Sequence, residues 1–421
     1  MDLVIIGNSA AGVAAAGAAR KASPAARITV IGDEGGTAYC RCLIPDVVAG
    51  TASFDRIVLQ SEEEFRREGV QLISGRAVEL LPGRRLVVLE DGREVPYDRL
   101  LVATGAEPVL PQLKGRELSG IFGFRSYTDA LAVAQTAGGA TDALVLGGGL
   151  VGLKAAYALK KRGLPRVTLV VKSRHLMTRQ LDEESAALVE EHFRDMGVDL
   201  IFQTDAAAFL PGRDGGRVGS VLLEDGREIP AQLVIAGKGV RPRSDLVARA
   251  GGDVRRGIVA DRFLRTSLPD VYAAGDCTEV VDALTGRSVP SGLWPLAVEQ
   301  GRHAGLAMAG HPAVYPPVLT ARNSVRFGRL SVVAVGRKDA GGEEITFRRR
   351  EPAPGSLKRF FIRDDRLLGY VLVNDIDKAG VYTALVRSGR RVPGLARLLA
   401  GEKLPLAVAG GRFPARKGWQ Y

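Results

Sequence analysis

Short apolar runs that end in a glycine-rich turn occur twice in this chain and define its organisation. Leu3 to Ile6 is apolar at every position, and after the turn at residues 7–12 the chain continues with the alanine-rich residues 13–20. The same order returns over residues 143–152. A short continuous apolar run is typical of a strand buried on both faces of a parallel sheet, and small helix-forming residues after it predict a helix. The pattern therefore predicts an α/β protein with two parallel sheets.

The two turns carry the glycine spacing of dinucleotide-binding sites. The first reads G-x-S-x-x-G and the second reads G-x-G-x-x-G. The first glycine allows the tight bend, a small middle residue lets a pyrophosphate approach, and the last glycine lets the helix pack closely on the strand. The helix N-terminus offers free N–H groups and the positive end of its dipole to the phosphates. Two such turns, each between a strand and a helix, predict two Rossmann-like three-layer domains and two bound dinucleotides. The residues of these predicted sites are Gly7, Ser9, Ala10, Ala11 and Gly12 in the first turn, and Gly147, Gly149, Leu150, Val151 and Gly152 in the second.

The strand after each of these helices ends in a different kind of residue. In the first unit Glu34 fits the acidic residue that holds a ribose, with Asp33 as the second candidate. In the second unit Val171 takes this place, and Lys172 and Arg174 follow it. A missing carboxylate beside two cations suits a 2′-phosphate, which favours NADPH slightly over NADH. The alternative is that these basic residues are simply solvated.

Composition fits a chain of about two to four ordinary globular domains. Of its 421 residues, 46% are hydrophobic and 25% are charged, and 58 Lys and Arg against 47 Asp and Glu give a net charge of +11. The basic residues are dispersed and no nucleic-acid motif is present, so we expect a solvated surface or an acidic redox partner. No apolar stretch approaches the roughly 18 residues of a membrane helix. With Asp2 at its start the chain shows no signal peptide, and we expect a cytoplasmic protein without membrane contact.

The cysteines and histidines of the chain argue against a disulfide scaffold and against a metal site. Three cysteines are too few for a disulfide scaffold and suit a reducing compartment. Cys277 stands in a tight A-G-D-C turn, where we expect it to be buried packing. The four histidines show no spacing typical of metal ligands, so we expect no metal.

Four further segments give the chain a specific resemblance. They are Y-D-R-L-L-V-A-T-G at residues 97–105, F-R-S at 124–126, L-V-I-A-G-K-G-V-R-P at 233–242 and T-S-L-P-D-V-Y-A-A-G-D at 266–276. Together with the two turns, these segments resemble the FAD-dependent pyridine nucleotide–disulfide oxidoreductases. The run from residue 369 to residue 387 resembles the NADH oxidase, rubredoxin reductase and nitrite reductase branch of that family.

The resemblance implies a division into three parts and a set of cofactor ligands. It implies a split FAD domain at residues 1–110 and 242–312, an NAD(P) domain at 111–241, and a C-terminal α+β domain at 313–421 that makes a homodimer contact. It also implies that Asp276 binds the ribityl chain of the flavin, and that a helix over residues 295–309 points its N-terminus at the flavin ring. Further cofactor residues implied by the resemblance are Arg41, Ala103, Thr104, Gly105, Arg125, Gly239, Gly275, Trp294 and Ala297.

Cys42, three residues before Pro45, leaves two chemistries open. It occupies the place of the redox-active cysteine in single-cysteine relatives such as coenzyme A disulfide reductase, where a helix start would lower the thiol pKa. Flavin-only relatives have proline there, and Tyr39 with Arg41 matches their Y-x-R-P loop, so Cys42 could equally be packing. A bond between Cys40 and Cys42 is not expected, because residues at i and i+2 project their Cβ atoms apart on a helix or strand.

Two charged positions depart from the flavin-only relatives. Those relatives carry a lysine at the position of Asp46 and a glutamate at the position of Lys154, which pair beside the flavin. Both signs are reversed in this sequence. Either the two residues are unrelated surface positions, or they form a pair of opposite order near the flavin.

These observations together favour an FAD-dependent NAD(P)H oxidoreductase. In the leading interpretation, hydride passes from NAD(P)H to FAD, and electrons then pass to an external acceptor such as an iron–sulfur protein, rubredoxin or a partner subunit. The alternative is a Cys42-dependent reductase of coenzyme A disulfide, polysulfide, peroxide or oxygen. A third possibility is a flavin-binding regulatory subunit without activity, which two intact dinucleotide sites disfavour.

Overall fold

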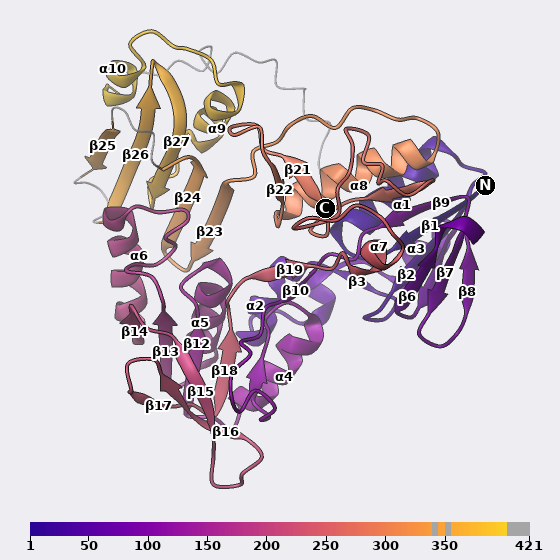
Figure 1. Cartoon of the computed structure of the whole chain (residues 1–421). Helices are drawn as coiled ribbons and strands as arrows, with labels where there is room; N and C mark the ends of the chain where they lie inside the picture. Colours follow the sequence, from indigo (N-terminus) through magenta and orange to yellow (C-terminus); the bar gives the residue numbers. More distant parts are fainter. Residues whose placement is uncertain (339–343, 350–354, 402–421) are drawn as a thin grey trace. The chain divides into compact units, whose positions relative to one another are not determined.

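The computed structural model describes residues 1–338, 344–349 and 355–401, which form a mixed α/β protein (Figure 1). By their internal contacts these residues form two compact units. The first contains residues 1–174, 193–282 and 286–318, and the second contains residues 175–192, 283–285 and the chain from residue 319. None of the described helices is both long and apolar enough to cross a membrane.

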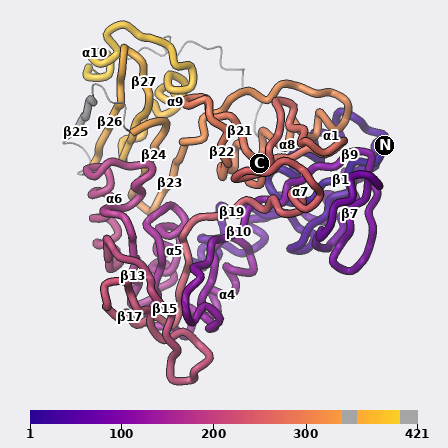
Figure 2. The backbone as a smooth tube through the Cα atoms, in the orientation of Figure 1, coloured from indigo at the N-terminus to yellow at the C-terminus, as the bar shows by residue number. Residues whose placement is uncertain are grey.

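The first sheet of unit 1 is parallel and has the strand order β20-β9-β1-β2-β5. Its core consists of apolar strand residues and the alanine face of helix α1. Helix α8 lies alongside α1, although the two are far apart in sequence (Figure 2). Gly301 and Gly305 permit this approach, since a Cβ on either would lie 2.1 and 2.3 Å from the carbonyl oxygens of Ala11 and Ala15. The elements are β1 (Asp2–Ile6), α1 (Ala10–Ala22), β2 (Arg27–Gly32), β5 (Val70–Ser74), β9 (Arg99–Val102), β20 (Val271–Ala273) and α8 (Trp294–Met308).

The second sheet of unit 1 is also parallel, with the order β11-β18-β12-β13-β14. Its strands β12 and β18 are buried at every residue, as expected for a sheet covered on both faces. The two parallel sheets confirm the predicted α/β class. The elements are β11 (Ile121–Phe122), α4 (Tyr127–Ala137), β12 (Asp142–Leu146), α5 (Leu150–Arg162), β13 (Arg166–Val171), β14 (Val198–Phe202) and β18 (Leu233–Ala236); α6 (Glu183–Asp195) follows β13 in the chain.

Smaller elements join and flank these sheets. The two-stranded β10–β19 ribbon carries both chain crossings between the sheets. Ser61 caps α3 with a reciprocal hydrogen-bond pair to Glu64, as the S-x-x-E spacing of these two residues favours. The flanking elements are β3 (Ala38–Tyr39), α2 (Ile44–Val48), β4 (Val58–Gln60), α3 (Glu62–Arg67), β6 (Ala77–Leu81), β7 (Leu86–Leu89), β8 (Glu94–Pro96), β10 (Ala106–Pro108), β15 (Ala206–Pro211), β16 (Val218–Leu223), β17 (Glu228–Pro230), β19 (Val240–Pro242), α7 (Asp245–Arg249), β21 (Glu279–Val281) and β22 (Ser288–Pro290).

Unit 2 is built on an antiparallel sheet of order β23-β24-β27-β26-β25. Gly328, with φ 60°, turns residues 322–336 into a hairpin of two antiparallel strands. Phe360, Tyr370 and Tyr382 pack edge to face in its core. The elements are β23 (Arg322–Phe327), β24 (Leu330–Gly336), β25 (Glu344–Arg349), β26 (Ser356–Arg363), β27 (Arg366–Val373), α9 (Ala379–Ser388) and α10 (Leu395–Ala400).

Unit 2 also contains residues 175–192, which come from the middle of the chain. The Arg359 guanidinium lies 2.7 Å from the Asp182 carboxylate, and the Lys338 ammonium donates to the Leu181 carbonyl at 3.1 Å. The three-part boundaries given by the resemblance stay a prediction, and residues 402–421 of the predicted third domain lie outside the described part of the chain.

Candidate functional site

The first glycine turn brings the ends of β1 and β9 into direct contact. Gly7 has φ +116°, and a Cβ there would lie 2.2 Å from the Ala103 carbonyl oxygen. A Cβ on Gly12 would lie 1.7 Å from the Gly7 carbonyl oxygen. Ser9 precedes α1 in an extended conformation, and its side chain accepts no capping hydrogen bond from the described helix. The first-turn N–H groups of α1 are therefore available to an anion, and Thr104 and Gly105 continue beside them after Ala103.

Helix α8 brings three more predicted residues to the same place. A Cβ on Gly275, whose φ is +83°, would lie 3.1 Å from the Ala11 Cβ and 3.7 Å from the Ala297 Cβ. Trp294 is the first residue of α8, and no described side chain caps this helix start. The structure therefore gathers the first turns of α1 and α8 with the A-A-G-D turn that follows β20.

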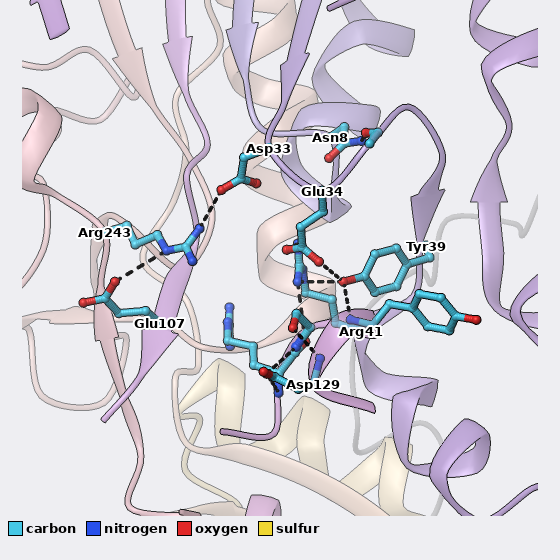
Figure 3. A network of polar contacts seen from close by, with 12 residues as sticks. Asn8, Asp33, Glu34, Tyr39, Arg41, Glu107, Asp129 and Arg243 are labelled. Carbon is cyan, nitrogen blue, oxygen red and sulfur yellow. Dashed lines mark hydrogen bonds and ion pairs between the residues drawn. The ribbon is translucent and has the colours of Figure 1, made fainter. Parts of the chain in front are cut away.

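Glu34 lies at the centre of a polar network with the loop that follows it (Figure 3). The Arg41 guanidinium lies 2.6 Å from one Glu34 carboxylate oxygen, and the Tyr39 hydroxyl donates to the other. Arg41 also donates to the Tyr39 hydroxyl at 3.0 Å, and this hydroxyl accepts the Tyr127 N–H at 2.8 Å. Burial alone would raise the pKa of Glu34, but the charge and hydrogen bonds of Arg41, with the bond from Tyr39, lower it below its usual value. The network fixes the 35–41 loop against the start of α4.

Asp33 has different partners from Glu34 (Figure 3). Its carboxylate lies 3.1 Å from the Arg243 guanidinium, which lies 3.7 Å from Glu107. The Arg243 carbonyl accepts the Thr104 hydroxyl at 2.6 Å. Sequence reasoning missed Arg243, although it directly follows the V-R-P segment that returns the chain to the first sheet. It also missed Asn8, whose buried amide donates to the Gly35 carbonyl at 2.9 Å.

Arg125 and Asp276, which the sequence assigned to the cofactor separately, form one ion pair at 2.7 Å. The N–H groups of Arg125 and Ser126 both donate to Asp129 at 2.9 Å, which fixes the segment before α4. On the other side of Asp276, the fully buried Gln300 accepts the Gly275 N–H at 2.8 Å. Gln300 was also missed, because nothing in a helical sequence indicates which glutamine faces a neighbouring turn.

Cys40 and Cys42 lie at a change of backbone direction before α2. Cys40 is extended (φ −80°, ψ 102°), and a 3-10 turn over Arg41–Leu43 follows it. The side chain of Cys42 and the N–H groups of Cys42 and Leu43 lower the pKa of the Cys40 thiol, whereas burial raises it. The lowering effects prevail, and the pKa of Cys40 is about 7. The neighbouring Cys40 side chain, together with burial, raises the pKa of Cys42.

The pKa of Cys42 is therefore shifted upward, opposite to the lowering that a helix start was expected to give, because the Cys40 side chain and burial act against the thiolate. Asp276 raises the pKa of Cys42 further and Arg125 opposes it, so the charges of this ion pair act on the Cys42 sulfur. Cys277 is fully buried and lies 3.4 and 3.3 Å from the carbonyl oxygens of Val102 and Ala274, which confirms its packing role.

The second glycine turn repeats the geometry of the first. Gly147 has φ +109° and its Cβ would lie 2.5 Å from the Gly237 carbonyl oxygen, while a Cβ on Gly152 would lie 1.9 Å from the Gly147 carbonyl oxygen. The middle residue, Gly149, has no atom within 4 Å of the place of a Cβ. It precedes α5, whose first residues Leu150 and Val151 have no capping side chain in the described structure. Gly239, with φ +97°, follows β18 and also faces open space.

The end of β13 presents exposed cations. Val171 is buried, whereas the Lys172 side chain is 70% exposed and lies 4.0 Å from Asp205 and 3.7 Å from Glu224. Arg174 is exposed. The helices that carry Asp46 and Lys154, α2 and α5, lie against each other, and Arg162 of α5 donates to the Val48 carbonyl at 2.8 Å. The pairing of Asp46 with Lys154 stays a prediction.

These features fit two dinucleotides. At each turn the chain leaves room that only a glycine or small residue can leave, and each helix start lacks a protein cap among the described residues. An acidic residue stands at the strand end that follows the first turn and its helix, and cations stand at the strand end that follows the second. The donor set suits a pyrophosphate in both turns.

Comparison with known proteins agrees with this geometry. A family model described as pyridine nucleotide-disulphide oxidoreductase matches residues 1–301. An NADH oxidase of Methanocaldococcus jannaschii is 34% identical over 346 residues, which are 80% of this chain and 76% of that protein. The NADH-dependent phenylglyoxylate dehydrogenase subunit epsilon of Aromatoleum evansii is 31% identical over 421 residues, 99% of this chain and 98% of that subunit. A chain of the covalent putidaredoxin reductase–putidaredoxin complex matches with a TM-score of 0.87 and 26% identity over 97% of both chains.

The matches confirm the family resemblance, the fold class and the use of FAD and NAD(P)H. The family model spans the first glycine turn, the second turn and the A-A-G-D segment at residues 273–276. This chain belongs to the pyridine nucleotide–disulfide oxidoreductase family and is an NAD(P)H-dependent flavoprotein oxidoreductase.

Proposed function

We propose that this enzyme passes electrons between NAD(P)H and a protein that carries an iron–sulfur cluster, as the flavin subunit of a larger assembly or as a separate reductase. The observation that carries this proposal is the end-to-end match to a subunit of an NADH-dependent dehydrogenase. The match to a reductase solved in complex with putidaredoxin supports it. The loop at residues 40–45 supports it too, because it lacks the C-x-x-x-x-C dithiol of the family's disulfide reductases.

FAD would supply the two-electron chemistry, and the residues of the first turn would hold and orient it. Gly7, Ser9 and Gly12 would leave room for the pyrophosphate at the N-terminus of α1, with Glu34 on the adenosine ribose. Asp276 would exchange its bond to Arg125 for the ribityl hydroxyls, and the N-terminus of α8 would stabilise negative charge on the reduced ring.

The second turn would bind the nicotinamide nucleotide over Gly147, Gly149 and Gly152. The open space at Gly149 supports this, because a pyrophosphate needs close backbone approach there. Lys172 and Arg174 support a preference for NADPH, since both are exposed at the strand end where an NADH enzyme often has a carboxylate.

The charge of the enzyme and its thiols support a kind of redox partner and a cell compartment. A net charge of +11 would attract an acidic redox protein and speed its encounter. The three free cysteines suit the cytoplasm, where thiols stay reduced. By resemblance to its family, the enzyme would be a homodimer that is assembled through the antiparallel sheet of unit 2.

An anaerobic titration with NADPH and then NADH tests the first half of this proposal. We expect one equivalent to bleach one flavin, apart from electrons taken up by thiols. The reduced enzyme is then mixed with an acidic [2Fe–2S] ferredoxin in a stopped-flow spectrometer, with ferricyanide as the control acceptor. We expect salt to slow the ferredoxin reaction at least about tenfold and the ferricyanide reaction much less. Faster flavin reoxidation by oxygen or by a small disulfide than by ferredoxin would contradict the proposal.

A second candidate function is reduction of a sulfur or peroxide acceptor through a cysteine. The observation that favours it is that Cys40 and Cys42 are both free thiols and that the charges of Asp276 and Arg125 act on the Cys42 sulfur. It needs the same NAD(P)H and FAD sites, so the two candidates differ only in what takes the electrons.

A further inference from the structure

We propose that Asp205 and Glu224 limit the preference of the second nucleotide site for NADPH, because they compete with the 2′-phosphate for Lys172. This inference deepens the proposed function and rests on its placement of the nicotinamide nucleotide at the second turn. It identifies two specificity-determining carboxylates that follow strands other than β13.

The first argument is where the two carboxylates stand. β13 ends at the buried Val171, so it supplies no acid at the place where an NADH enzyme often has one. Asp205 follows β14, the strand next to β13, and Glu224 directly follows β16. The Glu224 N–H donates to the Asp205 carbonyl at 2.8 Å, so the two residues lie side by side. Neighbouring elements therefore bring carboxylates to a strand end that has none of its own.

The second argument is the distance from each carboxylate to Lys172. The Lys172 ammonium lies 4.0 Å from the Asp205 carboxylate and 3.7 Å from the Glu224 carboxylate. Both distances exceed that of a hydrogen bond, so the two charges attract the ammonium without fixing it. The Lys172 side chain is 70% exposed and flexible, so it can turn to a phosphate. A 2′-phosphate would have to draw this lysine away from two carboxylates, whereas the ribose hydroxyl of NADH would not.

The third argument is that Asp205 is a fixed part of this edge of the sheet. Its side chain is 15% exposed, forms an ion pair with Lys238 and accepts the Ala206 N–H at 2.7 Å. Lys238 follows β18, and its backbone nitrogen lies 3.6 Å from the place of a Cβ on Gly147. These contacts connect the second glycine turn to the end of β13. Parallel sheets bind ligands at this carboxyl edge, so Asp205 belongs to the nucleotide site.

Removal of the two carboxylates should have different effects. Loss of the Glu224 charge leaves Lys172 beside one carboxylate instead of two. Loss of the Asp205 charge also releases Lys238, which adds a second available cation next to the turn. We therefore expect the Asp205 change to strengthen phosphate binding more than the Glu224 change does.

Calorimetric binding of adenosine 2′,5′-bisphosphate and adenosine 5′-monophosphate to the flavin-loaded enzyme tests the inference. The two ligands differ only in the 2′-phosphate, and neither carries a nicotinamide, so no electron transfer is involved. Glu224→Gln should bind the bisphosphate about two- to fivefold more tightly than wild type does, as the strength of an exposed ion pair allows, and should bind the monophosphate equally well. Asp205→Asn should show a larger gain for the bisphosphate.

The matched control is Asp199→Asn, which removes one exposed negative charge near the other end of β14. It should change neither affinity by more than about 1.5-fold. The flavin absorption of each variant shows that it has folded. Glu224→Gln leaves the Asp205–Lys238 pair intact, so this variant decides the inference if Asp205→Asn does not fold.

A double-mutant cycle tests whether Glu224 acts through Lys172. In a Lys172→Ala background, Glu224→Gln should change the affinity for the bisphosphate by less than about 1.5-fold. Two results would overturn the inference: equal tightening of both ligands by Glu224→Gln, or a gain for the bisphosphate that is as large without Lys172. A wild-type enzyme that binds neither ligand would also overturn it. Failure to reduce ferredoxin would contradict the proposed function alone, because the binding data do not depend on the electron acceptor.

Discussion

The two glycine turns of this enzyme are built alike, yet the chain after them differs. Gly7 and Gly147 have φ values of +116° and +109°, and in both turns a Cβ on the last glycine would clash with the carbonyl oxygen of the first. At the strand end that follows the first turn and its helix, Asp33 and Glu34 each form an ion pair with an arginine. After the second, Val171 is buried and exposed cations follow.

This difference separates two tasks. The turn itself meets a demand common to both nucleotides, which is close approach of a pyrophosphate to the backbone. The strand end after it distinguishes a nucleotide that stays from one that leaves at each turnover. A network of short bonds suits a permanent cofactor, because its groups are already ordered before the cofactor binds. Exposed lysine and arginine side chains suit an exchangeable one.

Replacement of the last glycine in either turn should have the largest effect, which is loss of the nucleotide that the turn binds. A Cβ on Gly12 would lie 1.7 Å from the Gly7 oxygen, and one on Gly152 would lie 1.9 Å from the Gly147 oxygen. Neither oxygen can move without opening its turn, so each alanine should cost about 3 kcal/mol or more locally. We expect Gly12→Ala to purify without flavin, and Gly152→Ala to keep a flavin that NAD(P)H no longer reduces. Visible absorption spectra before and after NAD(P)H addition measure both.

The matched control is Gly17→Ala in α1, where no atom lies within 4 Å of the new Cβ. We expect it to stabilise the helix by up to about 1 kcal/mol and to leave flavin binding unchanged. A Gly12→Ala protein that retains flavin and its reduction by NAD(P)H would show that the first turn does not hold the FAD.

The turns were predictable because close backbone contact requires glycine, and glycine spacing is visible in a sequence. The same holds for Ser61, whose capping signal is local. The partners of Glu34 were not predictable in this way. Arg41 lies seven residues away in an irregular loop, and Tyr127, which joins the same network, is far along the chain. The abrupt turn at Arg41 between Cys40 and Cys42 was not predictable either, because it follows no periodicity in the sequence.

Charge reversal at the strand end after the second turn tests whether the cations there favour NADPH over NADH. We expect Lys172→Glu with Arg174→Glu to raise the KM for NADPH by roughly 10- to 100-fold, because two contacts to the 2′-phosphate become repulsive. The KM for NADH should change less than about threefold. Steady-state ferricyanide reduction measures both constants. Arg213→Glu with Arg217→Glu, an exposed change of equal charge between β15 and β16, is the control. Equal effects on both nucleotides would mean that the two cations are only solvated surface.

Exchange of the charges of Asp46 on α2 and Lys154 on α5 tests a smaller effect. This effect would be on the flavin potential or on nicotinamide binding. If Asp46 and Lys154 act as a pair beside the flavin, Asp46→Lys alone should shift the flavin potential or weaken nicotinamide binding a few-fold. Adding Lys154→Glu should restore the starting value, with a coupling energy of about 0.5–3 kcal/mol. Spectroelectrochemical titration of the single and double variants measures this coupling. Purely additive effects would mean two independent surface charges.

The smallest expected effect is on the pH dependence of the unfolding free energy in acid. We expect Glu34 to contribute to it and the second site not to contribute. The pKa of Glu34 is lowered in the folded protein by Arg41 and Tyr39 despite its burial. A lowered folded pKa means that the stabilisation is complete above the unfolded value near 4.3 and is lost as the pH falls through the folded pKa. Wild type should therefore exceed Glu34→Gln in unfolding free energy by about 1–2 kcal/mol at pH 7 and lose this advantage below about pH 4. Urea unfolding of the flavin-free proteins from pH 3 to pH 7 measures the difference, and a gap that is independent of pH would mean that the Arg41 pair contributes by packing and not by charge.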